Sequence, residues 1–140
     1  MKQITQFLFE SLAKPKTKEE LRKLVKQMIK QKKFKELNNI DVSNITDMSD
    51  LFNGLEISNI DISDWDVSNV EDMWSMFKNS EFNGDISNWD VSNVKNMALM
   101  FYRSKFKGNI DNWDVSNVED MQDMFKDCPL EKNPPKWYKK

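Results

Sequence analysis

The stretch DVSNVEDMWSMF, from Asp66 to Phe77, is one of four similar stretches in this chain of 140 residues. The other copies begin at Asp41, Asp90 and Asp114, so that successive copies start 25, 24 and 24 residues apart. A period of this length is typical of stacked repeats, in which each unit buries its apolar face against the next. The repetition therefore predicts one elongated domain whose role is to display a surface.

Seven apolar positions recur in phase in all four copies and predict how each repeat folds. The first three follow the spacing apolar-x-x-apolar-x-apolar, which resembles the strand part of a leucine-rich repeat. The last four are spaced i, i+3, i+6 and i+7, which is one face of two helical turns. In the second copy these positions are Ile62, Trp65, Val67, Val70, Met73, Met76 and Phe77. We therefore expect an α/β solenoid of short parallel strands and short helices.

A serine stands just before each expected helix and is a candidate N-cap. In two copies a glutamate follows three residues later, as in a capping box. The four serines are Ser43, Ser68, Ser92 and Ser116. We expect each serine to begin the helix of its repeat.

The chain divides into a cap, an array and a tail. Residues 1–36 predict an N-terminal helical cap, residues 37–128 the four-repeat leucine-rich-repeat-like array, and residues 129–140 a C-terminal capping tail. A repeat array needs covered ends, which is the role we expect for both flanking segments.

Two amphipathic segments make up the expected N-terminal cap. Residues 3–12 place Ile4, Phe7, Leu8 and Leu12 on one helical stripe. After Pro15, a capping box that begins at Thr17 predicts a second helix from residue 18 to about residue 33.

The repeated signature WDVSNV-x-x-M-x-x-MF resembles a known family. Together with FNGDISN at Phe82 to Asn88, it is similar to the BspA-type leucine-rich repeats of the DUF285 group. That group is found in bacterial surface proteins and in mycoplasma, phage and giant-virus genomes. The resemblance covers residues 37–125 and implies a right-handed solenoid used for adhesion or protein binding. It brings no catalytic residues with it.

The composition argues against an enzyme and against a cofactor or metal site. The chain has no histidine, which removes the commonest general base and metal ligand at neutral pH. Its single cysteine, Cys128, excludes a multi-cysteine zinc site and an intrachain disulfide framework. No nucleophile–base pair or phosphate-binding loop can be assembled from the rest. We therefore expect no catalysis, no cofactor and no metal.

The sequence also bears on location and partners. No apolar run approaches the roughly 18 residues of a membrane span, and no secretion signal is recognisable, so we expect a cytoplasmic protein. Residues 1–40 carry eleven basic against four acidic residues, whereas residues 41–128 carry six against eighteen. Nucleic acid is not the expected partner, because the array is acidic and no aromatic residues interleave with the N-terminal lysines.

Two polar columns are identical in every repeat and are candidate structural ladders. Each aspartate can accept hydrogen bonds from the backbone two and three residues later, and a divalent cation between repeats is the alternative. The asparagines are expected to be buried and to satisfy loop backbone groups. The columns are Asp41, Asp66, Asp90 and Asp114, and Asn44, Asn69, Asn93 and Asn117.

A third column holds Trp65, Trp89 and Trp113, which could stack on sugars or fill the core. Its regular period, and its replacement by Ile40 in the first repeat, favour the core.

The positions that differ between repeats are the better candidates for partner binding. Trp74, Leu99, Tyr102 and Arg103 occupy such positions and are expected to stand together on the surface. Exposed aromatic residues beside an arginine are typical of interface anchors, although scattered surface hydrophobic residues are an equally ordinary explanation.

The most direct interpretation is a non-catalytic repeat module that binds another protein. The alternative is a phage- or virus-encoded inhibitor, whose acidic array mimics nucleic acid and blocks a basic groove of a host protein. Salt separates the two, because a mimic loses affinity steeply as ionic strength rises. The sequence does not identify the oligomeric state.

Overall fold

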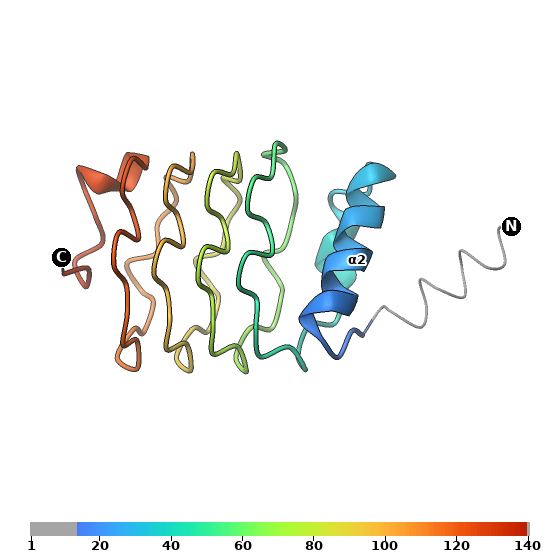
Figure 1. Cartoon of the computed structure of the whole chain (residues 1–140), viewed down its shortest axis with the longest axis horizontal. Helices are drawn as coiled ribbons and strands as arrows, with labels where there is room; N and C mark the ends of the chain where they lie inside the picture. Colours follow the sequence, from blue (N-terminus) through green and yellow to red (C-terminus); the bar gives the residue numbers. More distant parts are fainter. Residues whose placement is uncertain (1–13, 140) are drawn as a thin grey trace, which may run out of the picture.

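The computed structural model describes residues 14–139 and shows similar coils of chain stacked along one axis (Figure 1). One α-helix, α2 (Lys18–Lys30), lies at the N-terminal end of the stack. Two short 3-10 helices follow, η1 (Glu36–Asn39) and η2 (Pro129–Glu131). The stripe expected within residues 3–12 lies outside the described residues. No helix of residues 14–139 is long and apolar enough to cross a membrane.

Helix α2 forms where the capping box predicts it. The side chain of Thr17 accepts a hydrogen bond from the N–H of Glu20 at 3.1 Å. The helix ends before residue 33 because Lys32 adopts a left-handed conformation (φ 60°). The N–H groups of Lys32 and Lys33 then bond to Ile29 and Met28, which is a Schellman motif. The apolar face of α2 is buried against the array and consists of Leu21, Leu24, Val25 and Met28.

The predicted α/β solenoid of short parallel strands and short helices is wrong. The described part of the chain contains no sheet, and its only β-type pairings are three isolated parallel bridges. They join Asp47, Asp72, Asn96 and Asp120 in sequence order. The repeats stack as irregular coils, and the predicted helices and their serine N-caps are absent from them.

Consecutive turns take the place of the expected helix in each repeat. In the second repeat the N–H of Met76 bonds to the carbonyl of Met73, and Ser75, the second of the two residues between them, has φ 55°. A second turn bonds Ser80 to Phe77 around Asn79, with φ 56°. These are the features of type II turns. These turns bury Met73, Met76 and Phe77, so the apolar spacing that predicted a helix is satisfied without one.

Main-chain hydrogen bonds between repeats stabilise these turns. The N–H groups of Met73, Ser75, Phe77 and Asn79 bond to the carbonyls of Asn96, Ala98, Met100 and Tyr102. Equivalent bonds link repeat 1 to repeat 2 and repeat 3 to repeat 4. We call residues 46–54, 71–79, 95–103 and 119–127 the ladder segments. Every second N–H of a ladder segment points toward the C-terminal end of the stack.

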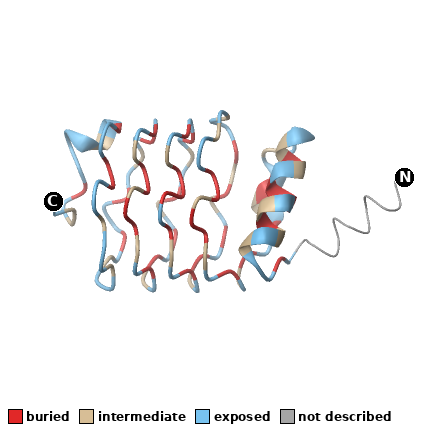
Figure 2. Ribbon diagram, in the orientation of Figure 1, coloured by how far each residue is buried: buried red, intermediate tan, exposed pale blue. Residues whose placement is uncertain are grey.

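The core is a set of side-chain columns that run along the stack. Figure 2 shows that buried residues recur in the successive coils. Phe52, Phe77, Phe101 and Phe125 stack in order, with ring centroids 5.5 to 5.7 Å apart. The tryptophan column is buried, as predicted: Trp65, Trp89 and Trp113 are at most 4 % exposed. Each indole N–H bonds to a carbonyl one repeat earlier, for example Trp89 to Ile62 at 3.0 Å. A sugar-stacking role is therefore excluded for this column.

The C-terminal tail continues the tryptophan column. Trp137 stacks on Trp113 at 6.4 Å and donates its indole N–H to Ile110 at 2.9 Å. Tyr138 packs edge-on against Phe125 at 5.0 Å. Trp137 follows Trp113 by 24 residues, so the spacing of the repeat extends into the tail.

Candidate protein-binding surface

Trp74 is the only large hydrophobic residue classed as exposed among residues 14–139, with an exposed fraction of 37 %. It lies in a column with Ser49, Ala98 and Gln122, and the stack accommodates all four side chains. The N–H of Trp74 bonds to the carboxylate of Asp72 at 2.9 Å, which holds the first turn of the repeat. The fold therefore uses the backbone of Trp74 and leaves its ring partly free.

Leu99 and Arg103 both occupy left-handed corners of the turns in repeat 3, with φ 59° and 56°. The other repeats mostly place residues that tolerate this conformation at the same positions. They are Asp50, Ser75 and Asp123 at the first corner, and Gly54, Asn79 and Asp127 at the second. Leucine and arginine are unusual at such corners, and repeat 3 has both.

Two cations lie near the ring of Tyr102. The Arg103 guanidinium is 5.2 Å and the Lys78 ammonium 5.7 Å from the centroid of its ring. Both distances are within the range of cation–π attraction. Arg103 also pairs with Asp127 at 3.7 Å. These contacts hold an aromatic ring and two positive charges on the outside of repeats 2 and 3.

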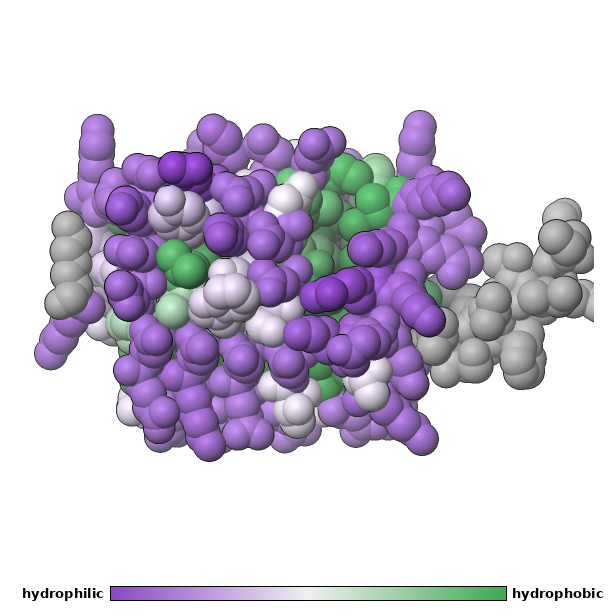
Figure 3. Space-filling model, viewed as in Figure 1, coloured by the Kyte–Doolittle hydropathy of each residue, from purple (hydrophilic) through white to green (hydrophobic). Residues whose placement is uncertain are grey.

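The structure brings the four predicted residues onto neighbouring ladder segments. The N–H of Ser75 bonds to the carbonyl of Ala98, so Trp74 and Leu99 lie on adjacent repeats. Among the described residues no ring contact joins Trp74 to Tyr102. The candidate surface therefore has two separate aromatic parts, one at Trp74 and one at Tyr102. Figure 3 shows that hydrophobic areas interrupt a mostly hydrophilic face. Sequence reasoning missed Lys78, although it shares a column with Tyr102.

The aspartate column forms a row of local turns on the surface. In every repeat the first carboxylate oxygen accepts from both the N–H and the hydroxyl of the serine two residues later, as Asp90 does from Ser92 at 3.0 and 2.6 Å. The same serines were predicted as N-caps of helices. Their hydroxyl hydrogen bonds lower the pKa of Asp41, Asp90 and Asp114, and the backbone bonds add to this effect.

The asparagine column is a ladder between repeats, and it is exposed rather than buried. The side chains of Asn69, Asn93 and Asn117 donate to the carbonyls of Ser43, Ser68 and Ser92 at 2.7 to 2.8 Å. Asn44, Asn69 and Asn93 line a shallow polar groove of about 440 Å³. Their amides thus tie the aspartate turns of adjacent repeats together.

No group of three or more acidic or cysteine side chains in residues 14–139 is arranged to hold a metal ion. Cys128 is a buried thiol whose sulfur lies 3.2 Å from the carbonyl of Phe106. Burial raises the pKa of Cys128. Neither feature adds a chemical group to the candidate surface.

Comparison with known proteins gives one match. No curated protein and no solved structure matches the chain. Residues 19–137 match the family described as "Mycoplasma protein of unknown function, DUF285". This match extends from helix α2, through all four repeats, to Trp137. Because it covers more than half of the chain, the protein belongs to the DUF285 family.

Proposed function

We propose that this protein is a non-catalytic module that binds another protein through Trp74, Leu99, Tyr102 and Arg103. The observation that carries the proposal is that leucine and arginine occupy the two left-handed corners of repeat 3. Strained backbone conformations are found at functional sites more often than elsewhere, because selection for function keeps residues that stability alone would replace. Leu99 and Arg103 stand at such corners, on the repeat adjacent to the exposed Trp74.

The side chains at this surface suit a protein partner. Tryptophan, tyrosine and arginine are the residues most enriched among interface hot spots. Tyr102 is already held by Lys78 and Arg103, so less side-chain entropy is lost when a partner covers it. The resemblance of the repeats to those of BspA-type proteins adds support from the sequence, since that resemblance implies adhesion or protein binding.

The test compares Trp74→Ala with Gln122→Ala, which changes the same column in repeat 4. We expect neither variant to change the free energy of unfolding by more than about 1 kcal/mol, because both side chains are exposed. Each variant is mixed with a cell lysate, the proteins bound to it are cross-linked to it, and the amount of each captured protein is measured. A specific partner is lost with Trp74→Ala, by about 2 kcal/mol or more of binding free energy, and retained with Gln122→Ala.

A second variant separates function from stability. Arg103→Asn places at this corner the residue that repeat 2 has at Asn79. We expect it to raise the free energy of unfolding by about 1 kcal/mol, because asparagine tolerates the left-handed region better. It should at the same time weaken partner binding. If Arg103→Asn stabilises the protein and leaves binding unchanged, the corner has no role in recognition.

The exposed aspartate row favours a second candidate function, the mimicry of nucleic acid by an inhibitor. Asp41, Asp66, Asp90 and Asp114 are all exposed and recur once in each repeat. Hydrogen bonds from Ser92 lower the pKa of Asp90, whereas the charge of Asp114 in the next repeat acts in the opposite direction. The double reversal Asp66→Lys with Asp90→Lys tests this candidate. It should abolish capture of the partner at low salt, whereas Trp74→Ala should not.

A further inference from the structure

At the C-terminal end of the stack, a row of main-chain donors has no hydrogen-bond acceptor among residues 14–139. In repeats 1 to 3, four N–H groups of each ladder segment bond to the carbonyls of the next repeat. The equivalent N–H groups of repeat 4 belong to Met121, Asp123, Phe125 and Asp127. No hydrogen bond within residues 14–139 has any of these four as its donor. Unpaired main-chain groups along an edge are a template for another segment of chain.

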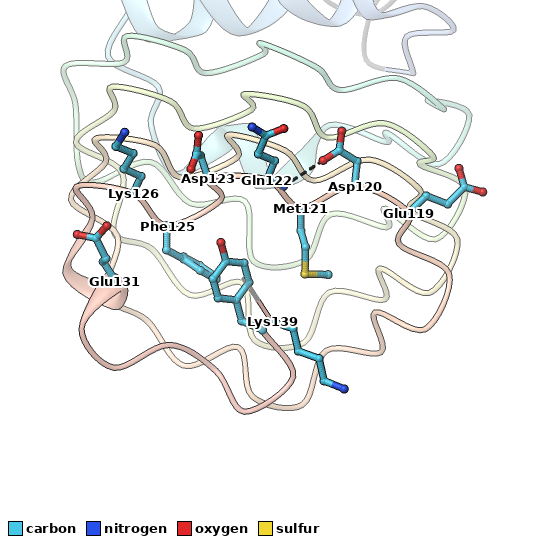
Figure 4. Close-up of a pocket in the computed structure, with 10 residues that line it drawn as sticks. Glu119, Asp120, Met121, Gln122, Asp123, Phe125, Lys126, Glu131 and Lys139 are labelled. Carbon is cyan, nitrogen blue, oxygen red and sulfur yellow. Dashed lines mark hydrogen bonds between the residues drawn. The ribbon is translucent and has the colours of Figure 1, made fainter.

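A hollow of about 470 Å³ is lined by three of the four donor residues, Met121, Asp123 and Phe125 (Figure 4). Met121, Phe125 and Tyr138 supply its apolar part. The side chains of Asp120, Gln122 and Asp123 lie on the opposite side of the segment from Met121 (Figure 4). The charged residues of the lining are Glu119, Asp120, Asp123 and Glu131 against Lys126 and Lys139, so acids outnumber bases.

The contact between repeats 2 and 3 shows what kind of segment accepts hydrogen bonds from such a row of donors. Four N–H groups of repeat 2 bond at 2.9 to 3.1 Å to alternate carbonyls of KNMALMFYR, which is residues 95–103. Lys95, at the start of that segment, pairs with Glu71 at 3.2 Å. Repeat 4 has Glu119 at the position of Glu71, and its row ends at Asp127, which already pairs with Arg103 of repeat 3. A basic residue at the start of a segment therefore matches Glu119, and the excess of acids in the lining favours a basic segment as a whole.

We propose that the ladder segment of repeat 4, residues 119–127, is a second binding site, which takes a basic peptide segment of a partner protein in the ladder conformation. Alternate carbonyls of the peptide accept from Met121, Asp123, Phe125 and Asp127. A basic residue at the start of the peptide pairs with Glu119. The site is separate from the Trp74 surface and does not depend on the proposed function.

The peptide KNMALMAYR, blocked at both ends, is the probe for this site. It copies residues 95–103 with alanine in place of Phe101, because Tyr138 already covers the ring of Phe125. The whole protein is titrated with the peptide while amide hydrogen exchange is followed by NMR. At a free peptide concentration about ten times Kd, exchange at the four donors should slow about tenfold. Failure of the peptide to saturate the protein, or binding without protection of these amides, would overturn the proposal.

A pair of charge reversals locates the peptide. Glu119→Lys changes the exposed end of the row, and Glu71→Lys makes the same change where repeat 3 already covers it. We expect Glu119→Lys to weaken binding by about fivefold at low salt, as the loss of an exposed ion pair predicts. Glu71→Lys should leave Kd unchanged. Equal effects of both reversals, or binding of a peptide with glutamate in place of lysine and arginine, would also overturn the proposal.

Discussion

The two ends of the stack are closed in different ways. At the N-terminal end, α2 covers the first repeat with a continuous apolar face, and Lys18 bonds to Ser49 at 2.9 Å and pairs with Asp47 at 3.3 Å. At the C-terminal end, the tail places Trp137 and Tyr138 over two aromatic columns and leaves the main-chain donors beside them unpaired. A regular helix therefore covers one end, whereas a short and mostly irregular tail covers the other.

The difference follows from the direction of the ladder bonds. Most bonds between ladder segments run from an N–H group to a carbonyl of the next repeat, although the first residue of each later segment donates back, as Glu71 does to Thr46. Within residues 14–139 the four N–H groups of repeat 4 that correspond to the forward donors have no acceptor. The two ends of the stack are consequently different chemical surfaces. We infer that the N-terminal end is a structural cap and that the C-terminal end is available for binding.

The largest expected difference between the ends concerns apolar packing. Leu24 of α2 is 1 % exposed, whereas Leu130 of the tail is only partly buried. Leu24→Ala should lower the free energy of unfolding by about 2–5 kcal/mol as a large-to-small core change. Leu130→Ala should cost about 1 kcal/mol, since less apolar area is lost. Urea denaturation measures both, and equal losses would mean that the tail seals its end as tightly as α2 does.

The indole hydrogen bonds allow a smaller comparison of the interior with the C-terminal end. Trp113→Phe removes the 3.1 Å bond to Ile86 within the stack, and Trp137→Phe removes the equivalent bond to Ile110 in the tail. We expect Trp113→Phe to lower the free energy of unfolding by about 1–2 kcal/mol. Trp137→Phe should lower it by about half as much, because Trp137 is only partly buried. Thermal unfolding of the two variants gives the ratio. A larger loss for Trp137→Phe would contradict the picture of a loosely closed end.

Each end of the stack has a residue in the left-handed conformation, and the two residue types differ in how well they tolerate it. Lys32 ends α2 with φ 60°, and Asp127 ends the last ladder segment with φ 59°. Lys32→Gly should stabilise the protein by about 0.5–1 kcal/mol, because glycine is the usual residue at this position of a Schellman motif. Asp127→Gly should change little, since aspartate tolerates this region better than lysine. Stabilisation by Asp127→Gly alone would reverse the expected ranking.

The smallest expected effect is the acid response at the N-terminal end. Burial opposes ionisation of Asp47, but hydrogen bonds from Ser49 and the Lys18 charge leave its pKa below the ordinary value of 3.8. The folded state therefore gains stability from this carboxylate above pH 3.8 and loses it as the pH falls through the lowered pKa. The melting temperature of Asp47→Asn should fall less steeply below pH 4 than that of the unaltered protein. Parallel curves would show that Asp47 does not contribute.

The sequence predicted helix α2 and the buried columns correctly. Thr17 and Glu20 begin the helix by a hydrogen bond between neighbours in the chain, which local sequence specifies. The in-phase recurrence of Trp65, Trp89 and Trp113 likewise indicated burial, because a repeated apolar position must face its own copies. The positions of Trp74 and Arg103 on variable columns could also be read from the repeats alone.

The backbone path of the repeats was decided by tertiary structure. A segment such as Met73 to Phe77 is too short to form a stable helix by itself, since helix nucleation is costly. Bonds from alternate N–H groups to the next repeat replace the bonds that a helix would make, and Ser75 and Leu99, which donate two of them, are left-handed. Apolar spacing determines which side chains share a face, but contacts with the neighbouring repeat determine which backbone conformation puts them there.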